Sequence, residues 1–247
     1  MINIMPRLKY QFLASEEDRK HLLNPVPASK AVPDWYKNMP RARNINTLEP
    51  MKSAFEVDTI NGGLRGGITL KECIPVRDYL TSGYIIPMWL DLAVNVSEGT
   101  PHFAWGYKDT LKVGNHPDYQ VYKSPLENKK CPTSGIPKLF SPWGFKTPKG
   151  YSSFFFSPKY SQSKLEILPA IVDTDTHHEI NFPFLYHGEE GCRDLIKRGE
   201  PIIQVIPFKR ESWNHSVSTG EFMADKTFRT FLIGAYLKLK HQKKSFM

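Results

Sequence analysis

The segment Met-Trp-Leu-Asp-Leu-Ala-Val-Asn-Val, residues 88–96, decides the fold class, because its larger aliphatic side chains occupy every second position. A period of two is typical of a half-buried β-strand. Further strand candidates follow the same reasoning at residues 102–107, 119–123, 151–157, 165–172, 179–186 and 201–208. The segments between them contain Gly-Asn-His-Pro, Ser-Pro-Trp-Gly and Thr-Pro-Lys-Gly, which favour turns. Many strands with short turns predict a mainly β protein, an antiparallel β-sandwich or jelly roll.

Outside these strands, the sequence predicts short helices and an irregular start. Residues 1–50 are interrupted by prolines at 25, 27, 33 and 40 and form an irregular N-terminal arm, in which Ser15 is suited to be a helix N-cap. A short helical stretch is expected around residues 77–80, and a helix at 189–198 between Gly188 and Gly199. An amphipathic C-terminal helix is expected because apolar residues recur at helical spacing: Phe228, Phe231, Leu232, Ala235, Tyr236 and Leu239.

These segments predict one domain over residues 1–247. Residues 1–50 are its irregular arm, residues 51–220 its β-rich body, and residues 221–247 its C-terminal helix with a basic tail. The 247 residues are long enough for a single core in a sandwich or barrel. A hydrophobic fraction of 40% and a charged fraction of 23% are ordinary for a globular protein and argue against global disorder.

Composition also indicates the compartment. No run approaches the roughly 20 apolar residues of a membrane span, and the start Met-Ile-Asn-Ile-Met-Pro-Arg lacks the apolar region of a signal peptide. Cys73, Cys131 and Cys192 are odd in number and far apart, which argues against a disulfide framework or a zinc knuckle. We expect reduced thiols, a cytoplasmic location and no membrane partner.

The formal net charge of +8 and the sequence pI of about 9.2 allow an anionic partner. The clearest basic cluster lies in the C-terminal tail: Lys238, Lys240, Lys243 and Lys244. Nucleic acid is a possible partner of this tail, but no aromatic–basic recognition motif accompanies it. A solvated helix end, where lysines suit the helix dipole, is the favoured interpretation.

Four segments together resemble a known group of proteins: Thr-Ser-Gly-Tyr-Ile-Ile-Pro (81–87), Thr-Pro-Lys-Gly-Tyr-Ser (147–152), Ile-Val-Asp-Thr-Asp (171–175) and Gly-Glu-Pro-Ile-Ile-Gln-Val-Ile-Pro (199–207). The resemblance is to an uncharacterised family of marine T4-like bacteriophages with distant bacterial relatives. It covers residues 30–215 and implies a viral origin, hence a host-cell cytoplasm or virion location. It supplies no catalytic residues.

A non-haem iron site is one candidate centre. His116-Pro117-Asp118, then His178, then Arg210-Glu211-Ser212 resemble the order of ligands and oxoacid-binding arginine in iron(II)/2-oxoglutarate oxygenases. The resemblance implies His116, Asp118 and His178 as iron ligands and Arg210 as the 2-oxoglutarate anchor. The spacing from His178 to Arg210 is longer than in that family, and the alternative is that His116 and Asp118 are turn residues.

A divalent-cation site is a second candidate, in Asp-Thr-Asp-Thr-His-His-Glu at residues 173–179. If this segment is a strand, Asp173, Asp175, His177 and Glu179 share one face and can ligate a cation. The favoured alternative is a solvated, charged sheet edge that discourages edge pairing. A turn organised by the two aspartates is also open.

A small-ligand pocket is the third candidate. Gln204 lies in an apolar strand, and a buried glutamine must find partners. Tyr84 and Trp105, with Arg210, are the side chains that we expect to line such a pocket, although core positions are commoner for aromatic residues. No Gly-x-Ser-x-Gly nucleophile motif occurs. The Gly-Gly-Leu-Arg-Gly-Gly at 62–67 lacks the Gly-Lys-Ser/Thr end of a phosphate loop and is interpreted as a turn.

Three functions fit these patterns. The favoured hypothesis is a non-enzymatic phage-type protein that acts in virion assembly or partner binding through its β-sandwich, with a protein partner or self-assembly. The alternatives are an iron(II)/2-oxoglutarate-type oxygenase on a jelly roll and a small-ligand binding protein. The sequence therefore leaves open whether the chain is an enzyme, and it establishes no cofactor outside the oxygenase alternative.

Overall fold

The computed structural model describes residues 8–51, 66–106, 112–127 and 135–217. Backbone contacts divide the chain into two compact units. The described residues 8–31 and 83–210 belong to the first unit, and those within 32–82 and 211–217 belong to the second. The single-domain organisation stays a prediction, and so do the limits of its arm and body. The C-terminal helix and the basic tail lie outside the described residues.

One sheet of the first unit is built around its longest strand, β10 (Ile136–Lys146). β10 pairs antiparallel with β14 (Glu179–Tyr186) on one side, and β14 pairs with β12 (Leu165–Ile167). On its other side β10 pairs with β9 (Lys112–His116) and then with β1 (Gln11–Leu13). The register of β10 shifts between Phe140 and Gly144, which marks a bulge around Pro142.

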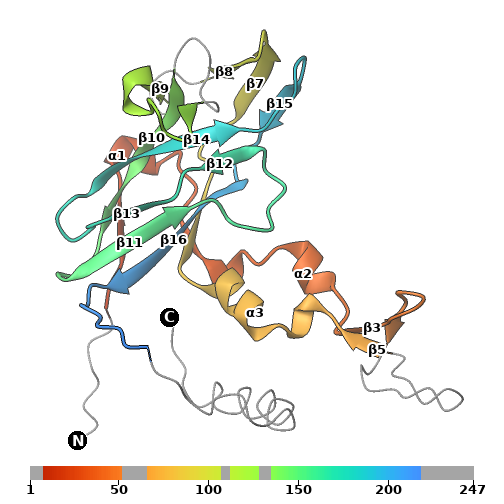
Figure 1. The fold of residues 1–247 in the computed structure, drawn as a ribbon. Coiled ribbons are helices and arrows are strands. Elements are labelled where there is room, and N and C mark those ends of the chain that lie inside the picture. Colours follow the sequence, from red (N-terminus) through yellow and green to blue (C-terminus); the bar gives the residue numbers. More distant parts are fainter. Residues whose placement is uncertain (1–7, 52–65, 107–111, 128–134, 218–247) are drawn as a thin grey trace, which may run out of the picture. The chain divides into compact units, whose positions relative to one another are not determined.

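The second sheet of this unit has the order β13-β11-β16-β6-β2 and is antiparallel throughout. Figure 1 shows its strands β13, β11 and β16 side by side. Its central strand β16 (Pro201–Lys209) lies between β11 (Tyr151–Phe156) and β6 (Tyr84–Pro87). The short strands β13 (Ala170–Val172) and β2 (Val26–Pro27) form its two edges. A short helix α1 (Glu16–Arg19), capped by Ser15 as predicted, and the 3-10 turn η1 (Ala28–Lys30) complete the N-terminal part.

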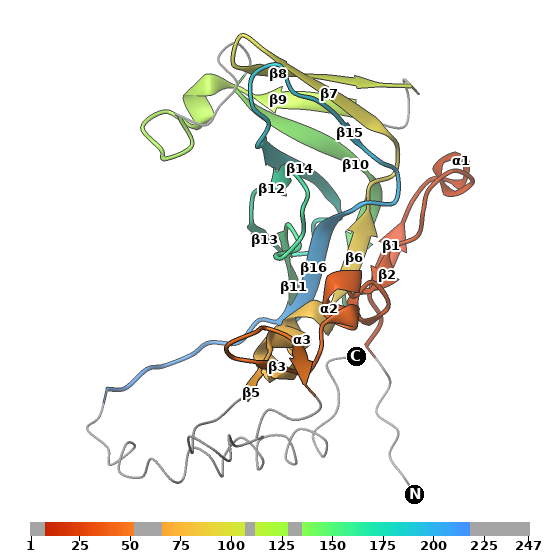
Figure 2. The same cartoon turned by 90° about the vertical axis from the view of Figure 1, so that its right-hand side faces the viewer.

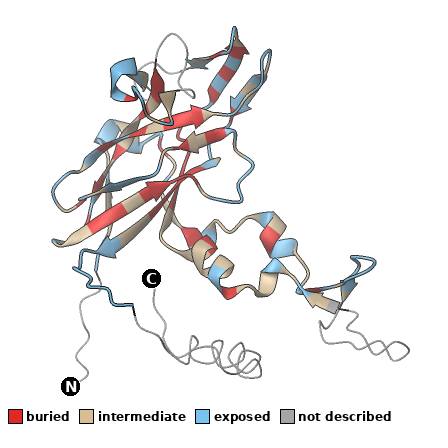
Figure 3. Cartoon of the chain, viewed as in Figure 1, coloured by how far each residue is buried: buried red, intermediate tan, exposed pale blue. Residues whose placement is uncertain are grey.

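The core lies between these two sheets, which makes this unit an antiparallel β-sandwich. Phe155 of β11 packs against Phe145 of β10 and Phe182 of β14, with ring centroids 5.1 Å and 5.5 Å apart. All three rings are buried, and so are Ile203 and Val205 of β16. Figure 3 shows the buried residues of the chain in red, many of them along the strands of this unit. Apolar residues of β6, β12 and β14 join the same cluster. The predicted fold class, mainly antiparallel β, is therefore confirmed.

A three-stranded sheet β15-β7-β8 also belongs to the first unit (Figure 2). β7 (Leu92–Ser97) pairs with β8 (Thr100–Trp105) through a two-residue turn in which Glu98 and Gly99 both have positive φ. The other neighbour of β7 is β15 (Arg193–Ile196). The alternation at 88–96 therefore predicts the strand correctly from Leu92, while residues 88–90 precede it.

Within the second unit, three short strands pair in the order β4-β3-β5: β4 (Pro50–Met51), β3 (Ala42–Asn44) and β5 (Gly66–Ile68). Among its described residues the helical elements are α2 (Asp34–Asn38), the 3-10 turn η2 (Leu70–Glu72) and α3 (Ile74–Thr81). The helical stretch expected around residues 77–80 is thus confirmed. No helix among the described residues is both long and apolar enough to cross a membrane.

Three of the predicted helix and strand assignments are wrong, and the turns predicted at Gly-Asn-His-Pro and Ser-Pro-Trp-Gly fall at the end of β9 and within β10 instead. Residues 189–198 are not helical, because 193–196 pair with β7 as β15 and a turn precedes them. Residues 118–120 form a 3-10 turn, η3, where a strand was predicted at 119–123. The single strand expected at 165–172 is two strands, β12 and β13, separated at Pro169, whose missing N–H cannot support a continuous ladder.

Candidate binding surface and pocket

The outer face of the β13-β11-β16 sheet carries a row of apolar side chains. Side chains alternate between the two faces of a strand, so Phe154 points away from the core that Phe155 enters. The register places Ile171 of β13 and Ile206 of β16 on either side of Phe154. Phe208 lies two residues beyond Ile206 along β16, on the same face. We call these four residues the outer-face patch.

The outer-face patch is accessible at both flanks. Ile171 is 64% exposed and Phe208 is 37% exposed, whereas Phe154 and Ile206 are half-buried between them. Phe154 also packs against Phe156 of the same strand, with ring centroids 4.6 Å apart. Exposed apolar side chains that lie next to one another on a sheet make this face a candidate contact site.

A charged cluster borders this patch at the end of β16, made by Arg210, Asp173, Asp175 and Ser152. The Arg210 guanidinium donates two hydrogen bonds to the Asp175 carboxylate, one of them 3.0 Å long, and lies 3.0 Å from Asp173 Oδ1. The Ser152 hydroxyl donates to Asp173 over 2.6 Å and accepts from Arg210 over 3.1 Å. The four side chains are therefore held in one arrangement, which we call the Arg210 cluster.

Arg210 holds the pKa of Asp175 at about 2, below the ordinary 3.8, and a hydrogen bond from the Gly150 N–H acts in the same direction. The same contact with Asp175 raises the pKa of Arg210. Asp175 and Arg210 therefore both stay ionised near neutral pH. The charges offer complementary contacts to a partner at the rim of an apolar surface.

Beneath the Arg210 cluster runs a chain of buried hydroxyl groups. Thr174 Oγ1 lies 2.9 Å from Thr147 Oγ1 and 2.8 Å from Ser153 Oγ. Ser153 Oγ lies 3.0 Å from the hydroxyl of Tyr10, whose pKa is raised by burial. The chain thereby connects residues beside β1 in one sheet with β11 in the other. Each hydroxyl has partners inside the protein, as buried polar groups require.

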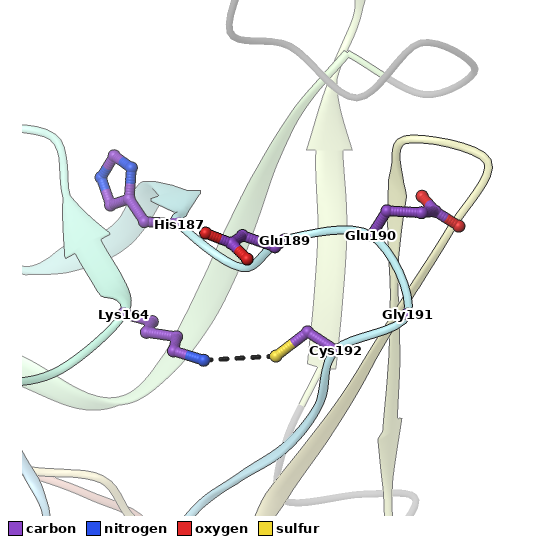
Figure 4. Close-up of a pocket in the computed structure, with 6 residues that line it drawn as sticks. All are labelled: Lys164, His187, Glu189, Glu190, Gly191 and Cys192. Carbon is purple, nitrogen blue, oxygen red and sulfur yellow. Dashed lines mark hydrogen bonds between the residues drawn. The ribbon is translucent and has the colours of Figure 1, made fainter.

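A hollow of about 480 Å³ lies elsewhere in the first unit, and it is lined by Lys164, His187, Glu189, Glu190, Gly191 and Cys192 (Figure 4). The Lys164 amine lies 3.2 Å from the Cys192 sulfur. Asp194 Oδ2 accepts from both groups, at 2.8 Å from the amine and 2.9 Å from the sulfur. Tyr186 donates to the same carboxylate oxygen through its hydroxyl group.

The contacts in this pocket favour the charged forms of Asp194 and Lys164. Hydrogen bonds from Cys192, Lys164 and Tyr186 hold the pKa of Asp194 well below its usual range. The hydrogen bond to Asp194 raises the pKa of Lys164, and partial burial together with Asp194 raises the pKa of Tyr186. At the rim, the His187 imidazole lies 2.7 Å from Glu166, whose pKa it lowers.

The structure brings some of the sequence-predicted residues together and separates others. Asp173, Asp175 and Arg210, taken from two different hypotheses, form one cluster. Residues 173–176 make a turn and not the strand that the cation-site hypothesis assumed, and the His177 N–H donates to the Asp173 carbonyl. The turn organised by aspartates, which the sequence left open, is the observed arrangement.

The predicted iron ligands occupy different local settings. His116 ends β9 and its Nδ1 lies 2.7 Å from the Gln120 side chain, while Asp118 begins η3. His178 precedes β14, and its carbonyl accepts from the Phe145 N–H. Among the described residues, no group of three or more His, Cys, Asp or Glu side chains is arranged to hold a metal ion. The iron and 2-oxoglutarate site and the cation site therefore stay predictions.

Of the residues predicted to line a ligand pocket, Gln204 and Tyr84 lie in sandwich strands and Trp105 lies in the three-stranded sheet, while Arg210 follows β16 in the Arg210 cluster. Gln204 is buried on β16. Tyr84 of β6 stacks on Tyr10 with ring centroids 5.4 Å apart, and Trp105 at the end of β8 packs against the main core. Their role in binding a small ligand stays a prediction.

Sequence reasoning did not single out the outer-face patch or the Lys164–Cys192 pair. The patch has a readable signal in Phe154-Phe155-Phe156, since three consecutive aromatic residues in a strand put apolar side chains on both faces. The pair has no such signal, because Lys164 and Cys192 are brought together only by the positions of β12 and β15.

Comparison with known proteins gives no family for this chain. No protein-family model matches it, and no curated protein matches it. Among solved structures it is similar to a mutant dUTPase from phage phi11 of S. aureus, with 12% identity and a TM-score of 0.31 over 58% of this chain and 86% of the other. It is also similar to the dUTPase of Staphylococcus bacteriophage 80alpha with dUpNHpp, with 14% identity and a TM-score of 0.30 over 60% and 80% of the two chains. These scores are too low to establish a shared fold.

Proposed function

We propose that this chain is a self-associating assembly protein, and that the outer face of the β13-β11-β16 sheet is its contact surface. The observation that carries the proposal is the row Ile171–Phe154–Ile206 with Phe208 beside it. The core side of the sheet is filled by Phe155 and its partners, and on the opposite face the chain itself buries Phe156 and Gln204, so the exposed Ile171 and Phe208 mark the part that is open to another occupant. A second copy of the chain is the occupant that we propose.

Two features favour a second copy over an unrelated partner. Interfaces between identical subunits are more apolar than those between transient partners. The Arg210 cluster also carries both signs of charge on one border of the patch, with Arg210 beside Asp173 and Asp175. In a two-fold contact each copy presents this border to its mate, so a guanidinium of one copy can meet a carboxylate of the other.

The contact extends beyond the four apolar residues in this proposal. A stable interface buries roughly 800 Å² on each partner, which requires a rim around the patch. The half-exposed Arg210 side chain and the exposed Asp173 supply such a rim at the end of β16. The apolar residues then provide the free energy of association, and the charged border fixes the relative orientation of the copies.

Sedimentation velocity over a wide concentration range tests the proposal, with Ile171→Ser as the variant and Leu195→Ser as the matched control. Leu195 is likewise an exposed aliphatic residue, 51% exposed, on the separate strand β15. The wild-type chain and Leu195→Ser should associate as concentration rises, whereas Ile171→Ser should stay monomeric at the same concentrations. Equal urea midpoints would show that both variants are folded.

Two results contradict the proposal. A wild-type chain that is monomeric at every concentration would remove the second copy as occupant and leave a different protein partner. An assembly that Ile171→Ser and Leu195→Ser weaken equally would place the interface elsewhere.

A further inference from the structure

The Lys164 amine and the Cys192 sulfur form a reactive pair at the pocket of Figure 4, where the two side chains point toward one another. Their separation of 3.2 Å lies in the range from which bonds form between well-oriented groups. Asp194 contacts both groups through one oxygen, so it holds the two reactants side by side. Lys164 is half-exposed and Cys192 half-buried, so small solutes reach the pair.

We propose that a hydroperoxide couples Cys192 and Lys164 into a covalent sulfur–nitrogen bond. The site takes a small oxidant, hydrogen peroxide or an organic hydroperoxide, that fits the hollow of about 480 Å³. The inference is independent of the proposed self-association, since the pocket involves other strands.

The chemistry takes two balanced steps. In the first, the Cys192 thiol attacks the peroxide, the O–O bond breaks, and sulfenic acid and water form, so sulfur loses two electrons and the peroxide gains them. In the second, the Lys164 ammonium releases one proton to solvent. The free amine attacks the sulfenic sulfur, an S–N bond forms, and the S–OH group leaves as water with the second amine proton. With hydrogen peroxide the sum consumes one peroxide and yields two waters, one proton and a sulfenamide; with an organic hydroperoxide the water of the first step is replaced by the corresponding alcohol.

The surrounding groups act on different steps. The thiolate is the form of a cysteine that attacks peroxide, and the Lys164 ammonium donates to the Cys192 sulfur over 3.2 Å. Asp194 is a positioning residue, because it fixes the nitrogen beside the sulfur. Its negative charge keeps Lys164 protonated, so the second step waits for the proton to leave. The sulfenic acid therefore persists until that proton is lost, and the bond is made only where an amine is already in place.

The cross-link would tie the start of β12 to the start of β15. Lys164 precedes β12 in the sandwich and Cys192 precedes β15 in the three-stranded sheet. A bond between them closes a loop that contains β12, β13 and β14 and restrains β15 against the sandwich. Closing a loop lowers the entropy of the unfolded chain, so the linked protein should unfold at a higher urea concentration.

The experiment treats the full chain with hydrogen peroxide and follows it by intact mass and peptide mapping. We expect a product lighter by two hydrogens, in which the peptides containing residues 164 and 192 are joined and a thiol reductant separates them. Lys164→Arg keeps the cation but removes the amine nucleophile, so the linked product should fall at least about tenfold when the positioned amine is lost. Cys73→Ser, at the other described free thiol, should leave the yield unchanged.

The wild-type map alone can overturn the inference without any variant. Oxidation of Cys192 to sulfinic acid or to an intermolecular disulfide, with no joined peptide, contradicts it. A joined peptide that forms equally well in Lys164→Arg contradicts it too, because the nitrogen would then come from elsewhere.

Discussion

Replacing Thr174 by valine should destabilise the protein by about 2 kcal/mol. The Thr174 side chain is fully buried, and its hydroxyl makes two hydrogen bonds, to Thr147 and to Ser153. Valine keeps the shape and removes the hydroxyl. Each buried hydrogen bond contributes roughly 1 kcal/mol net, and the two former partners lose one contact each. Ser153 keeps Tyr10 and Thr147 keeps a backbone carbonyl, which limits the loss.

Urea unfolding followed by circular dichroism measures this free energy. Thr176→Val is the matched control, since Thr176 lies two residues away and is exposed, with a single hydrogen bond to the Asp173 carbonyl. It should change the stability by less than about 0.5 kcal/mol. A Thr174→Val variant as stable as Thr176→Val would refute the view that the hydroxyl chain stabilises the junction between the sheets.

Three further predictions concern the core of the sandwich, the Arg210 cluster and the glycine before β6. Phe155→Ala should cost about 3–5 kcal/mol in urea unfolding, because the ring fills the core, whereas Phe208→Ala, on a half-exposed ring, should cost far less. The pKa of Asp175 is lowered from 3.8 to about 2, so the ionised carboxylate stabilises the fold fully above pH 3.8 and this stabilisation is lost as pH falls through about 2. In an acid titration of unfolding free energy, Asp175→Asn should therefore lose less stability than the wild type in that pH window. Gly83→Ala should lower the thermal midpoint clearly more than Gly99→Ala, since both have positive φ but only at Gly83 does a Cβ fall 2.0 Å from a backbone oxygen.

The sequence predicts a strand best where the local side-chain pattern favours the same structure as the pairing with neighbouring strands. β14 has the predicted bounds, and β11 and β16 differ by one residue at an end. β10 escapes prediction because Pro137, Pro142 and Gly144 argue against a strand. The structure accommodates Pro142 and Gly144 at a bulge, which depends on the neighbouring strand and cannot be read from the local sequence.

Tertiary pairing also decides the outcome at β15, where residues 193–196 extend along β7 although the segment between two glycines favours a helix. The candidate residues show the same limit. Asp175 and Arg210 are recognisable individually as charged side chains beside predicted strands, yet 35 positions separate them, and the pairing of β13 and β16 on either side of β11 brings them into contact. Residue types are therefore predictable here, and their mutual distances are not.

Hydroxyl-radical footprinting at low and high protein concentration tests the central claim most directly, because it reports which side chains a second copy covers. The account predicts that labelling of Phe208 and Ile171 falls as concentration rises, while Tyr119, which is 76% exposed on a different part of the first unit, is labelled equally at both concentrations. Unchanged labelling of Phe208 and Ile171 in a sample that sedimentation shows to be associated would contradict it, since the copies would then meet through another surface.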